Sequence, residues 1–242
     1  MPLLEVTDLT VRYRTGAVGV QDVSFSVEPS QIVAVLGAAG AGKSTTVRGI
    51  SGFLRAEGAR VVKGSVRFQG RDITGREPHQ VCGLGVFAVP ERRKIFPNLS
   101  VHDNLEALGA RLVKGERRAA VEALVFELFP DLARDRRRLA GRLSGGQQQM
   151  LAIGRALMAD PKLLIVDEMT LGLHPSLHEP LFAAVQRIAA AGSAVLLVDE
   201  STGRTLEVAQ HCVLLKSGHV LAAGPSADFI GNEVLVAGYV GT

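Results

Sequence analysis

A glycine-rich segment with a lysine and two hydroxyl side chains carries the clearest chemical signal of the sequence. Residues 37–45 fit the pattern G-x-x-x-x-G-K-S/T, in which glycines let backbone N–H groups converge on phosphate groups. In that pattern Lys43 reaches the β- and γ-phosphates, and the Ser44 hydroxyl binds Mg²⁺. We therefore predict a nucleoside triphosphate site formed by Gly37, Ala38, Ala39, Gly40, Ala41, Gly42, Lys43, Ser44 and Thr45.

Two carboxylates follow a separate apolar segment. Residues 163–166 have the pattern of a buried strand, and Asp167 and Glu168 come directly after them. In open α/β sheets, ligands bind beyond the carboxyl ends of the strands, where the glycine-rich loop also lies. We therefore predict that Asp167 holds Mg²⁺, directly or through water. Glu168 is predicted to orient and deprotonate an attacking water, which makes it, with Lys43, a catalytic candidate.

A second anion site is expected at residues 143–147. Met150, Ile153 and Leu157 follow at helical spacing, so free N–H groups and a hydroxyl project from the start of the predicted helix. One chain has no second glycine-rich phosphate loop to match this site, although an ordinary capped helix is the alternative interpretation. The residues of this candidate site are Ser144, Gly145, Gly146 and Gln147.

The elements that position these groups follow from the same patterns. Residues 31–36 form a short apolar, β-branched run, as in a buried parallel strand. After Lys43, the residues Val47, Ile50 and Leu54 form an apolar helical stripe. Strand, glycine turn and helix is the context that the phosphate-loop pattern requires.

Together these motifs resemble the nucleotide-binding subunits of ATP-binding-cassette (ABC) transporters. Within that family the sequence is most similar to the second ATPase subunit of branched-chain amino acid importers. The resemblance rests on residues 37–45, residues 143–157 and the Asp167-Glu168 pair, and it spans about residues 3–241. Further matches are residues 89–91, 95–97 and 171–173, Gly218, and residues 239–241.

The resemblance implies an α/β fold, a P-loop NTPase core of the ABC type. It has a mixed sheet with an antiparallel β subdomain and an inserted helical subdomain. The whole chain, 1–242, would be one ABC ATPase domain, with residues 1–90 and 155–242 as the core and residues 91–154 as the helical subdomain. In the family, two subunits pack head to tail, and each signature, here residues 144–147, contacts the γ-phosphate held by the partner's phosphate loop. The implied cofactors are ATP and Mg²⁺.

Three positions near the motifs are informative. Tyr13 occupies the place where the family has an aromatic residue that stacks on adenine, although half-buried packing is the alternative. Glu91 stands where many members have a Gln that contacts Mg²⁺ and senses the membrane subunit. His174 lies in the dimer-facing loop, either as a partner contact or as a histidine without a role.

Glu200 departs most from the family. By register it occupies the switch position, where most members have a His that contacts the γ-phosphate and where the resembled group commonly has Gln. A carboxylate roughly 4 Å from that phosphate would be repelled by up to about 4 kcal/mol at an effective dielectric near 20. We hypothesise that Glu200 makes this chain's own ATP site the slower of two. The alternative is that Glu200 points to solvent.

The composition indicates the cellular compartment and the kinds of partner that we expect. No apolar run reaches the roughly 20 residues needed to span a membrane, and no signal-peptide pattern opens the sequence, so transport would need separate membrane subunits. Cys82 and Cys212 are too few for a disulfide framework, which favours a reducing cytoplasm. The formal net charge of +3 is modest, and the basic runs 92–94, 117–118 and 134–138 lack interleaved aromatics. We interpret these runs as solvated faces or surfaces near anionic lipid, not as nucleic-acid sites.

Periodicity also predicts local elements. Residues 4–6 and 23–27 alternate like antiparallel strands, and residues 212–216 and 219–223 are typical of a hairpin. The region from about 92 to 141 is helical in pattern, with stripes of only two or three turns. Ser100 and Asp103 are expected to cap one helix, and Ser176 and Glu179 another.

The sequence thus predicts a peripheral ATPase subunit at the cytoplasmic face of the membrane, energising uptake of branched-chain amino acids or related small polar solutes. The expected partners are two membrane permeases docked near Glu91, Phe96 and Leu99, a second ABC ATPase subunit and a solute-binding protein, and no nucleic acid. A homodimer is the alternative to two different ATPase subunits.

A soluble ABC ATPase that acts as a nucleotide-gated scaffold is the alternative function. A chromosome-maintenance or DNA-repair cassette would need a long heptad insertion, and the stretch between phosphate loop and signature is short.

Overall fold

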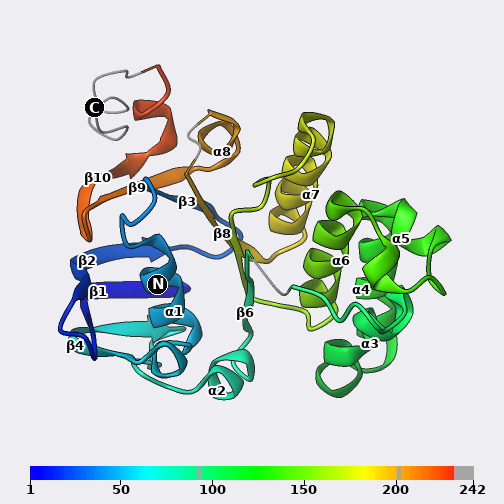
Figure 1. The fold of residues 1–242 in the computed structure, drawn as a ribbon, viewed down its shortest axis with the longest axis horizontal. Coiled ribbons are helices and arrows are strands. Elements are labelled where there is room, and N and C mark those ends of the chain that lie inside the picture. The colour runs from blue at the N-terminus through cyan, green and yellow to red at the C-terminus, as the bar shows by residue number, and fades with distance from the viewer. Residues whose placement is uncertain (92–93, 201–202, 232–242) are drawn as a thin grey trace.

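Two sheets and a group of helices build the molecule (Figure 1). The computed structural model describes residues 1–91, 94–200 and 203–231, and only the backbone of residues 109–112. Part of the basic run 92–94 and the family match at 239–241 therefore lie outside the described residues. The strands are β1 (Leu4–Tyr13), β2 (Val18–Val27), β3 (Ile32–Leu36), β4 (Ala59–Phe68), β5 (Arg71–Asp72), β6 (Val86–Val89), β7 (Leu163–Asp167), β8 (Ala194–Asp199), β9 (His211–Lys216) and β10 (His219–Pro225).

The larger sheet has the strand order β10-β9-β3-β8-β7-β6. Its strands β9, β3, β8, β7 and β6 are parallel, and β10 pairs antiparallel with β9 as the predicted hairpin. Every residue of β3 is buried, because alternate residues enter two different cores: Ala34 and Leu36 face one core, and Val33 and Val35 face the other. Burial on both faces explains the continuous apolar run in the sequence.

The smaller sheet is antiparallel, with the order β2-β1-β4-β5. Leu4 pairs with Val27 and Val6 with Phe25, so the predicted pairing of the first two strands is confirmed. Its inner face shares one core with helix α1 (Lys43–Ser51) and with one face of the larger sheet. The antiparallel sheet therefore flanks the helix that follows the phosphate loop.

Helices α3 (Val101–Leu112) to α7 (His178–Ala190) lie at the other end of the molecule, away from the antiparallel sheet (Figure 1). Gly154 of α6 lets α3, α4 and α5 pack closely, since a Cβ there would lie 3.0 Å from Val125 and 3.3 Å from Leu105. The predicted cap of α3 forms: the Ser100 Oγ accepts from the Asp103 N–H at 3.0 Å. The helices are α2 (Pro78–Cys82), α3 (Val101–Leu112), α4 (Gly115–Leu128), α5 (Pro130–Arg134), α6 (Gly145–Leu157), α7 (His178–Ala190) and α8 (Gly203–Val208), with 3₁₀ turns η1 (Arg55–Glu57), η2 (Ala140–Arg142), η3 (Pro175–Leu177) and η4 (Ser226–Asp228).

The predicted cap at Ser176 is wrong. Helix α7 begins at His178, and the residue before it has no capping side chain. Pro175, whose fixed φ suits the first position of a helical turn, starts the 3₁₀ turn η3 one residue ahead of Ser176. His174 therefore takes the cap position, and its Nδ1 accepts from the Ser176 N–H at 3.3 Å. The short helix α2 (Pro78–Cys82) was not predicted from the sequence.

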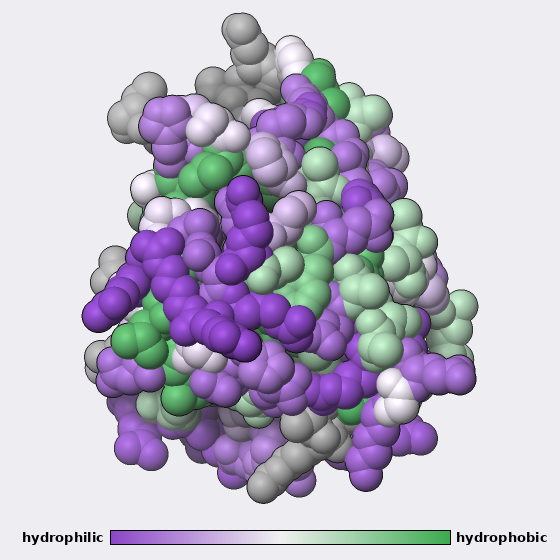
Figure 2. All heavy atoms as spheres, turned by 90° about the vertical axis from the view of Figure 1, so that its right-hand side faces the viewer, coloured by the Kyte–Doolittle hydropathy of each residue, from purple (hydrophilic) through white to green (hydrophobic). Residues whose placement is uncertain are grey.

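Charged side chains on the helical end of the molecule are mostly paired. Figure 2 shows hydrophilic residues over much of this face, with smaller hydrophobic areas between them. Carboxylates pair with five of the six described arginines of the basic runs, in Arg117–Asp160, Arg118–Glu106, Arg134–Asp131, Arg136–Glu122 and Arg138–Asp135. This neutralisation supports their interpretation as solvated faces. No helix in the described ranges combines the length and the apolar character needed to cross a membrane.

Candidate functional site

The phosphate loop joins β3 to α1 and depends on glycine geometry. Gly40 and Gly42 have φ angles of 79° and 107°, a region that favours glycine. A Cβ on Gly42 would also lie 2.6 Å from a Val20 methyl and 2.9 Å from the Gly19 carbonyl oxygen. The loop conformation therefore requires glycine at this position, as the sequence pattern predicts.

Lys43 lies at the centre of the site and is 5% exposed. Its Nζ donates to the carbonyl oxygens of Gly37 at 2.5 Å and Ala38 at 3.3 Å. The same Nζ lies 3.2 Å from Glu200 Oε1 and 4.0 Å from Glu168 Oε1. A buried cation is thus held in the loop by two carbonyls and two carboxylates.

An open pocket surrounds this lysine. Its walls bring together Lys43, Glu168 and Glu200 with most of the sequence-predicted loop residues; the full lining is Tyr13, Val18, Gly19, Ala39, Gly40, Gly42, Lys43, Ser44, Thr45, Glu168 and Glu200. Gly37 and Ala38 contribute their carbonyls to Lys43, and Ala41 is buried beneath the loop. Val18 and Gly19 had no signal in the sequence, since they enter the pocket only because β2 passes beside α1.

A neighbouring groove contains the predicted metal ligands. Ser44, Glu91 and Asp167 line it together with Arg48. Asp167 Oδ1 is buried and has no hydrogen-bond partner in the described part of the chain. Burial raises the pKa of the Asp167 carboxyl to about 6. A buried carboxylate oxygen without a donor is what a divalent cation would satisfy.

The donor set fits Mg²⁺ and not a cation bound by protein side chains alone. In the ranges that the structure describes, no three His, Cys, Asp or Glu side chains gather in a way that could hold a metal ion. Mg²⁺ is commonly held by one or two protein oxygens together with water and substrate phosphates. Asp167 and the Ser44 hydroxyl, beside the phosphate loop, match that arrangement.

Replacing Asp167 with Asn is expected to stabilise the nucleotide-free chain while impairing metal binding. The folded-state pKa near 6 exceeds the ordinary value of 3.8, so this carboxyl costs stability as the pH rises from 3.8 through about 6. At pH 7.5 the ionised carboxyl lowers the free energy of unfolding by about 2 to 3 kcal/mol, because each pKa unit corresponds to about 1.4 kcal/mol. In metal-free buffer, we expect Asp167→Asn to have a higher Tm than the unsubstituted chain. This difference in Tm should be larger at pH 7.5 than at pH 5. An equal difference at both pH values would contradict this.

Glu168 is held in an uncommon backbone conformation. Its φ is 49°, in the left-handed region, and its N–H donates to the Val198 carbonyl at 2.8 Å. Such conformations cost energy and concentrate at functional sites. Its side chain is 15% exposed, and burial, followed by the charge of Glu200, raises the pKa of this carboxyl. A raised pKa makes the carboxylate a better proton acceptor near neutral pH.

Tyr13 forms a wall of the pocket at the end of β1. Its hydroxyl and the Thr45 Oγ1 are 2.8 Å apart, so the ring is tied to α1. Gly19 gives the ring room, because a Cβ at that position would lie 2.7 Å from it. Tyr13 is half-buried. Its two sequence interpretations, stacking and packing, are both compatible with this placement.

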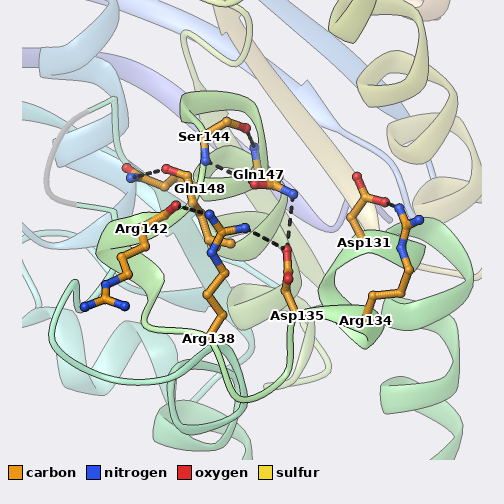
Figure 3. Close-up of polar contacts among 9 residues, drawn as sticks. Asp131, Arg134, Asp135, Arg138, Arg142, Ser144, Gln147 and Gln148 are labelled. Atoms are coloured by element: carbon orange, nitrogen blue, oxygen red, sulfur yellow. Dashed lines mark hydrogen bonds and ion pairs between the residues drawn. The ribbon is translucent and has the colours of Figure 1, made fainter.

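The signature segment forms a capped helix start (Figure 3). Ser144 Oγ accepts from the Gln147 N–H at 3.3 Å, and Gln147 Oε1 accepts from the Ser144 N–H at 3.1 Å. The Gln147 amide also donates to Asp135 at 3.4 Å. Arg138 contacts the same carboxylate and donates to the Arg142 carbonyl at 2.8 Å. In this pair of hydrogen bonds the Ser144 Oγ only accepts. Its own hydroxyl proton is therefore available to an acceptor from outside the helix, such as a phosphate oxygen.

The structure does not bring the signature to the phosphate loop of the same chain. In the described ranges, the side-chain hydrogen bonds of Ser144 and Gln147 go to each other and to Asp135. Gly146 packs instead on η3, because a Cβ added to Gly146 would overlap with the Leu177 side chain. The two anion-binding elements therefore sit apart in one chain (Figure 1).

Two apolar side chains near the signature are exposed. Phe96 is 48% exposed and Leu99 is 40% exposed. The guanidinium of Arg155 lies 4.7 Å from the centroid of the Phe96 ring, which fixes the ring at the surface. Both residues belong to the surface for which the sequence predicts a membrane partner.

Comparison with known proteins agrees with this geometry. The ABC transporter family pattern matches residues 20–171. The chain is 35% identical over 220 residues to the high-affinity branched-chain amino acid transport ATP-binding protein BraG of Pseudomonas aeruginosa, covering 91% of this chain and 92% of BraG. It is 30% identical over 244 residues to the lipopolysaccharide export system ATP-binding protein LptB of Haemophilus influenzae, covering 100% and 98%.

A solved structure extends the comparison to the fold. The crystal structure of a nucleotide-free ATP-binding cassette from an ABC transporter superposes with a TM-score of 0.84 at 26% identity, covering 99% of this chain and 98% of that one. The α/β fold, with its mixed sheet, antiparallel sheet and helical part, is thus the ABC fold predicted from the sequence. The chain belongs to the ABC transporter family and is an ATP-binding, ATP-hydrolysing subunit of that family.

Proposed function

We propose that this chain energises an importer for branched-chain amino acids or related small polar solutes. The observation that carries the proposal is the separation of a complete phosphate loop from a complete, capped signature within one chain. A second subunit that supplies its signature to Lys43, and accepts Ser144 in return, would complete both sites. The relative BraG, a branched-chain amino acid transport protein, supports the choice of solute.

In this proposal the side chains divide the work on ATP. Lys43 and the loop N–H groups bind the phosphates, Tyr13 supports the adenine, and Ser44, Asp167 and Glu91 hold Mg²⁺, which would screen phosphate charge. Glu168 takes the proton of the attacking water. The segment from 91 to 154 acts as the helical subdomain of a single ATPase domain, and residues 1–90 and 155–242 act as its core.

The proposed assembly sits at the cytoplasmic face of the membrane. Two permease subunits dock beside Glu91, Phe96 and Leu99, and a solute-binding protein delivers the solute from the other side. The second ATPase subunit is a related chain, with a second copy of this chain as the alternative. Exposed Phe96 and Leu99 offer the apolar contacts that such docking needs.

Glu200 is proposed to compete with the γ-phosphate for Lys43. The carboxylate lies 3.2 Å from the lysine Nζ, and this contact supports competition over the alternative in which Glu200 points to solvent. ATP must displace this carboxylate or bind beside it, and both cost energy because like charges repel. The Glu200 side chain is 47% exposed, so it can turn away from Lys43. Solvent screens the ion pair and so reduces the energy lost when it breaks.

Replacing Glu200 with Gln is therefore expected to tighten ATP binding and raise the turnover of the assembled complex. We expect a gain of about fivefold, or about 1 kcal/mol, because solvent screens part of the repulsion. Equilibrium ATP binding by the isolated chain and steady-state hydrolysis by the complex measure the two effects. Glu207→Gln, which removes an exposed carboxylate on α8, is the matched control. Unchanged or lower turnover in Glu200→Gln would overturn the competition.

Affinity purification of the tagged chain from native membranes tests the proposed assembly. Recovery with two hydrophobic permeases and a second ATPase subunit is the expected result. Recovery with components of a lipopolysaccharide export system, to which the relative LptB belongs, would favour export instead. Recovery with ribosomes or soluble assembly proteins alone would favour the scaffold function.

A further inference from the structure

We propose that a hollow lined by four arginines, adjoining Tyr13 but outside the nucleotide pocket, binds a small anion that carries two or more phosphate groups. The four residues are Arg12, Arg14, Arg55 and Arg60, and we call the hollow the arginine pocket. Its volume is about 570 Å³. That volume lies within the range of about 300–1,000 Å³ typical of small-molecule sites.

The backbone fixes the positions of these arginines. Arg12, near the end of β1, stands directly opposite Arg60, near the start of β4, in the antiparallel ladder. The next pair is Tyr13 with Ala59, and the Arg14 N–H donates to the Gly58 carbonyl at 2.8 Å. Arg55 reaches the pocket from the turn η1 just before β4. Strand register therefore fixes Arg12 and Arg60, and Arg14 and Arg55 lie in turns beside these strands.

The charge of the pocket is not balanced by the protein. No lining residue is acidic. Within residues 1–91, 94–200 and 203–231, Arg12, Arg14 and Arg60 enter no ion pair, and only Arg55 has a carboxylate partner, Glu77 at 2.8 Å. Like charges directly opposite on neighbouring strands destabilise a sheet. The paired arginines of the helical end show that this chain elsewhere places carboxylates beside its arginines.

The chemistry of guanidinium groups indicates the occupant. Their planar forks bind phosphate oxygens through pairs of parallel hydrogen bonds. Several guanidiniums around one hollow match an anion with more than one phosphate. The shared wall also links the two sites, because Tyr13 lines both pockets and its hydroxyl contacts Thr45 of the phosphate loop. An anion in the arginine pocket is therefore adjacent to the adenine end of the proposed ATP site.

Calorimetric titration with inorganic pyrophosphate tests the site. A Lys43→Ala background weakens the phosphate loop, so that the remaining binding reports the arginine pocket. In that background, we expect Arg12→Gln with Arg60→Gln to weaken pyrophosphate binding by about tenfold or more. Arg67→Gln with Arg71→Gln is the matched control, because it removes two exposed charges from the same sheet away from the pocket. Undetectable binding in the Lys43→Ala chain, or equal weakening by both double variants, would overturn the proposal.

Two further measurements keep the result interpretable. Thermal unfolding of the Arg12, Arg60 variant should show an unchanged or higher Tm, since a like-charge pair is removed. Co-sedimentation with phosphatidylcholine vesicles containing phosphatidylglycerol distinguishes the source of the phosphate. Arginine-dependent binding to these vesicles without pyrophosphate binding would overturn the small-anion proposal in favour of lipid headgroups, and binding to neither also overturns it. Because these measurements need neither ATP hydrolysis nor a permease, their failure leaves the proposed transport function untouched.

Discussion

Glu168→Gln is expected to reduce ATP hydrolysis by about 10²- to 10⁴-fold while ATP binding persists, because a general base contributes about that factor. Glu168 lies on the pocket wall beside Lys43, and its pKa is raised by burial. Gln keeps the shape and the hydrogen-bonding oxygen but cannot accept the proton of water. Removal of a negative charge 4.0 Å from Lys43 also favours retention of the triphosphate.

Single-turnover hydrolysis and equilibrium ATP binding, measured on the same complex, separate the two effects. Glu207→Gln serves again as the control for loss of a carboxylate at the surface. Loss of a general base should slow hydrolysis by far more than about tenfold. If the Glu168→Gln complex hydrolyses ATP within about tenfold of the unsubstituted rate, Glu168 is not the general base.

Lys43→Ala is expected to weaken ATP binding and to lower turnover by about 10²- to 10³-fold, as for the loss of one preorganised donor to developing charge. The effect should exceed that of an ordinary surface lysine because Lys43 is buried and is the cation that faces both Glu168 and Glu200. Without it, the two carboxylates face the incoming phosphates uncompensated.

Lys162→Ala is a suitable control, since Lys162 makes a surface hydrogen bond with Gln69. Lys43→Arg tests geometry separately from charge, because a guanidinium is larger than an ammonium and presents a planar fork. Binding of ATP by Lys43→Ala with unchanged affinity would contradict the central place of this lysine.

Much of the fold follows from local sequence patterns. The alternation in β1 and β2, the apolar run of β3 and the hairpin of β9 and β10 each depend on residues close together in the chain. The phosphate loop and the signature helix were predicted for the same reason, since each motif includes its own strand or helix context. The cap at Ser176 failed because Pro175 shifted the start of the turn by one residue.

Contacts between distant segments could not be predicted from the sequence. Lys43 and Glu200 are 157 positions apart, and their ion pair exists only because β8 lies beside β3. Asn104, fully buried, ties the segment before α3 to that helix by accepting from the Phe96 N–H at 2.8 Å and donating to its carbonyl at 2.9 Å. The arginine pocket likewise depends on the register that sets Arg12 opposite Arg60.

Uptake of labelled solutes by intact cells tests most directly whether ATP hydrolysis at this site drives import. Cells carrying Glu168→Gln at the native locus are compared with unsubstituted cells, with a deletion of the gene and with Glu207→Gln. We expect uptake of at least one branched-chain amino acid or related small polar solute to fall in Glu168→Gln cells to the level of the deletion, while Glu207→Gln cells transport normally. Unchanged uptake of leucine, isoleucine, valine and urea in Glu168→Gln cells would contradict this expectation.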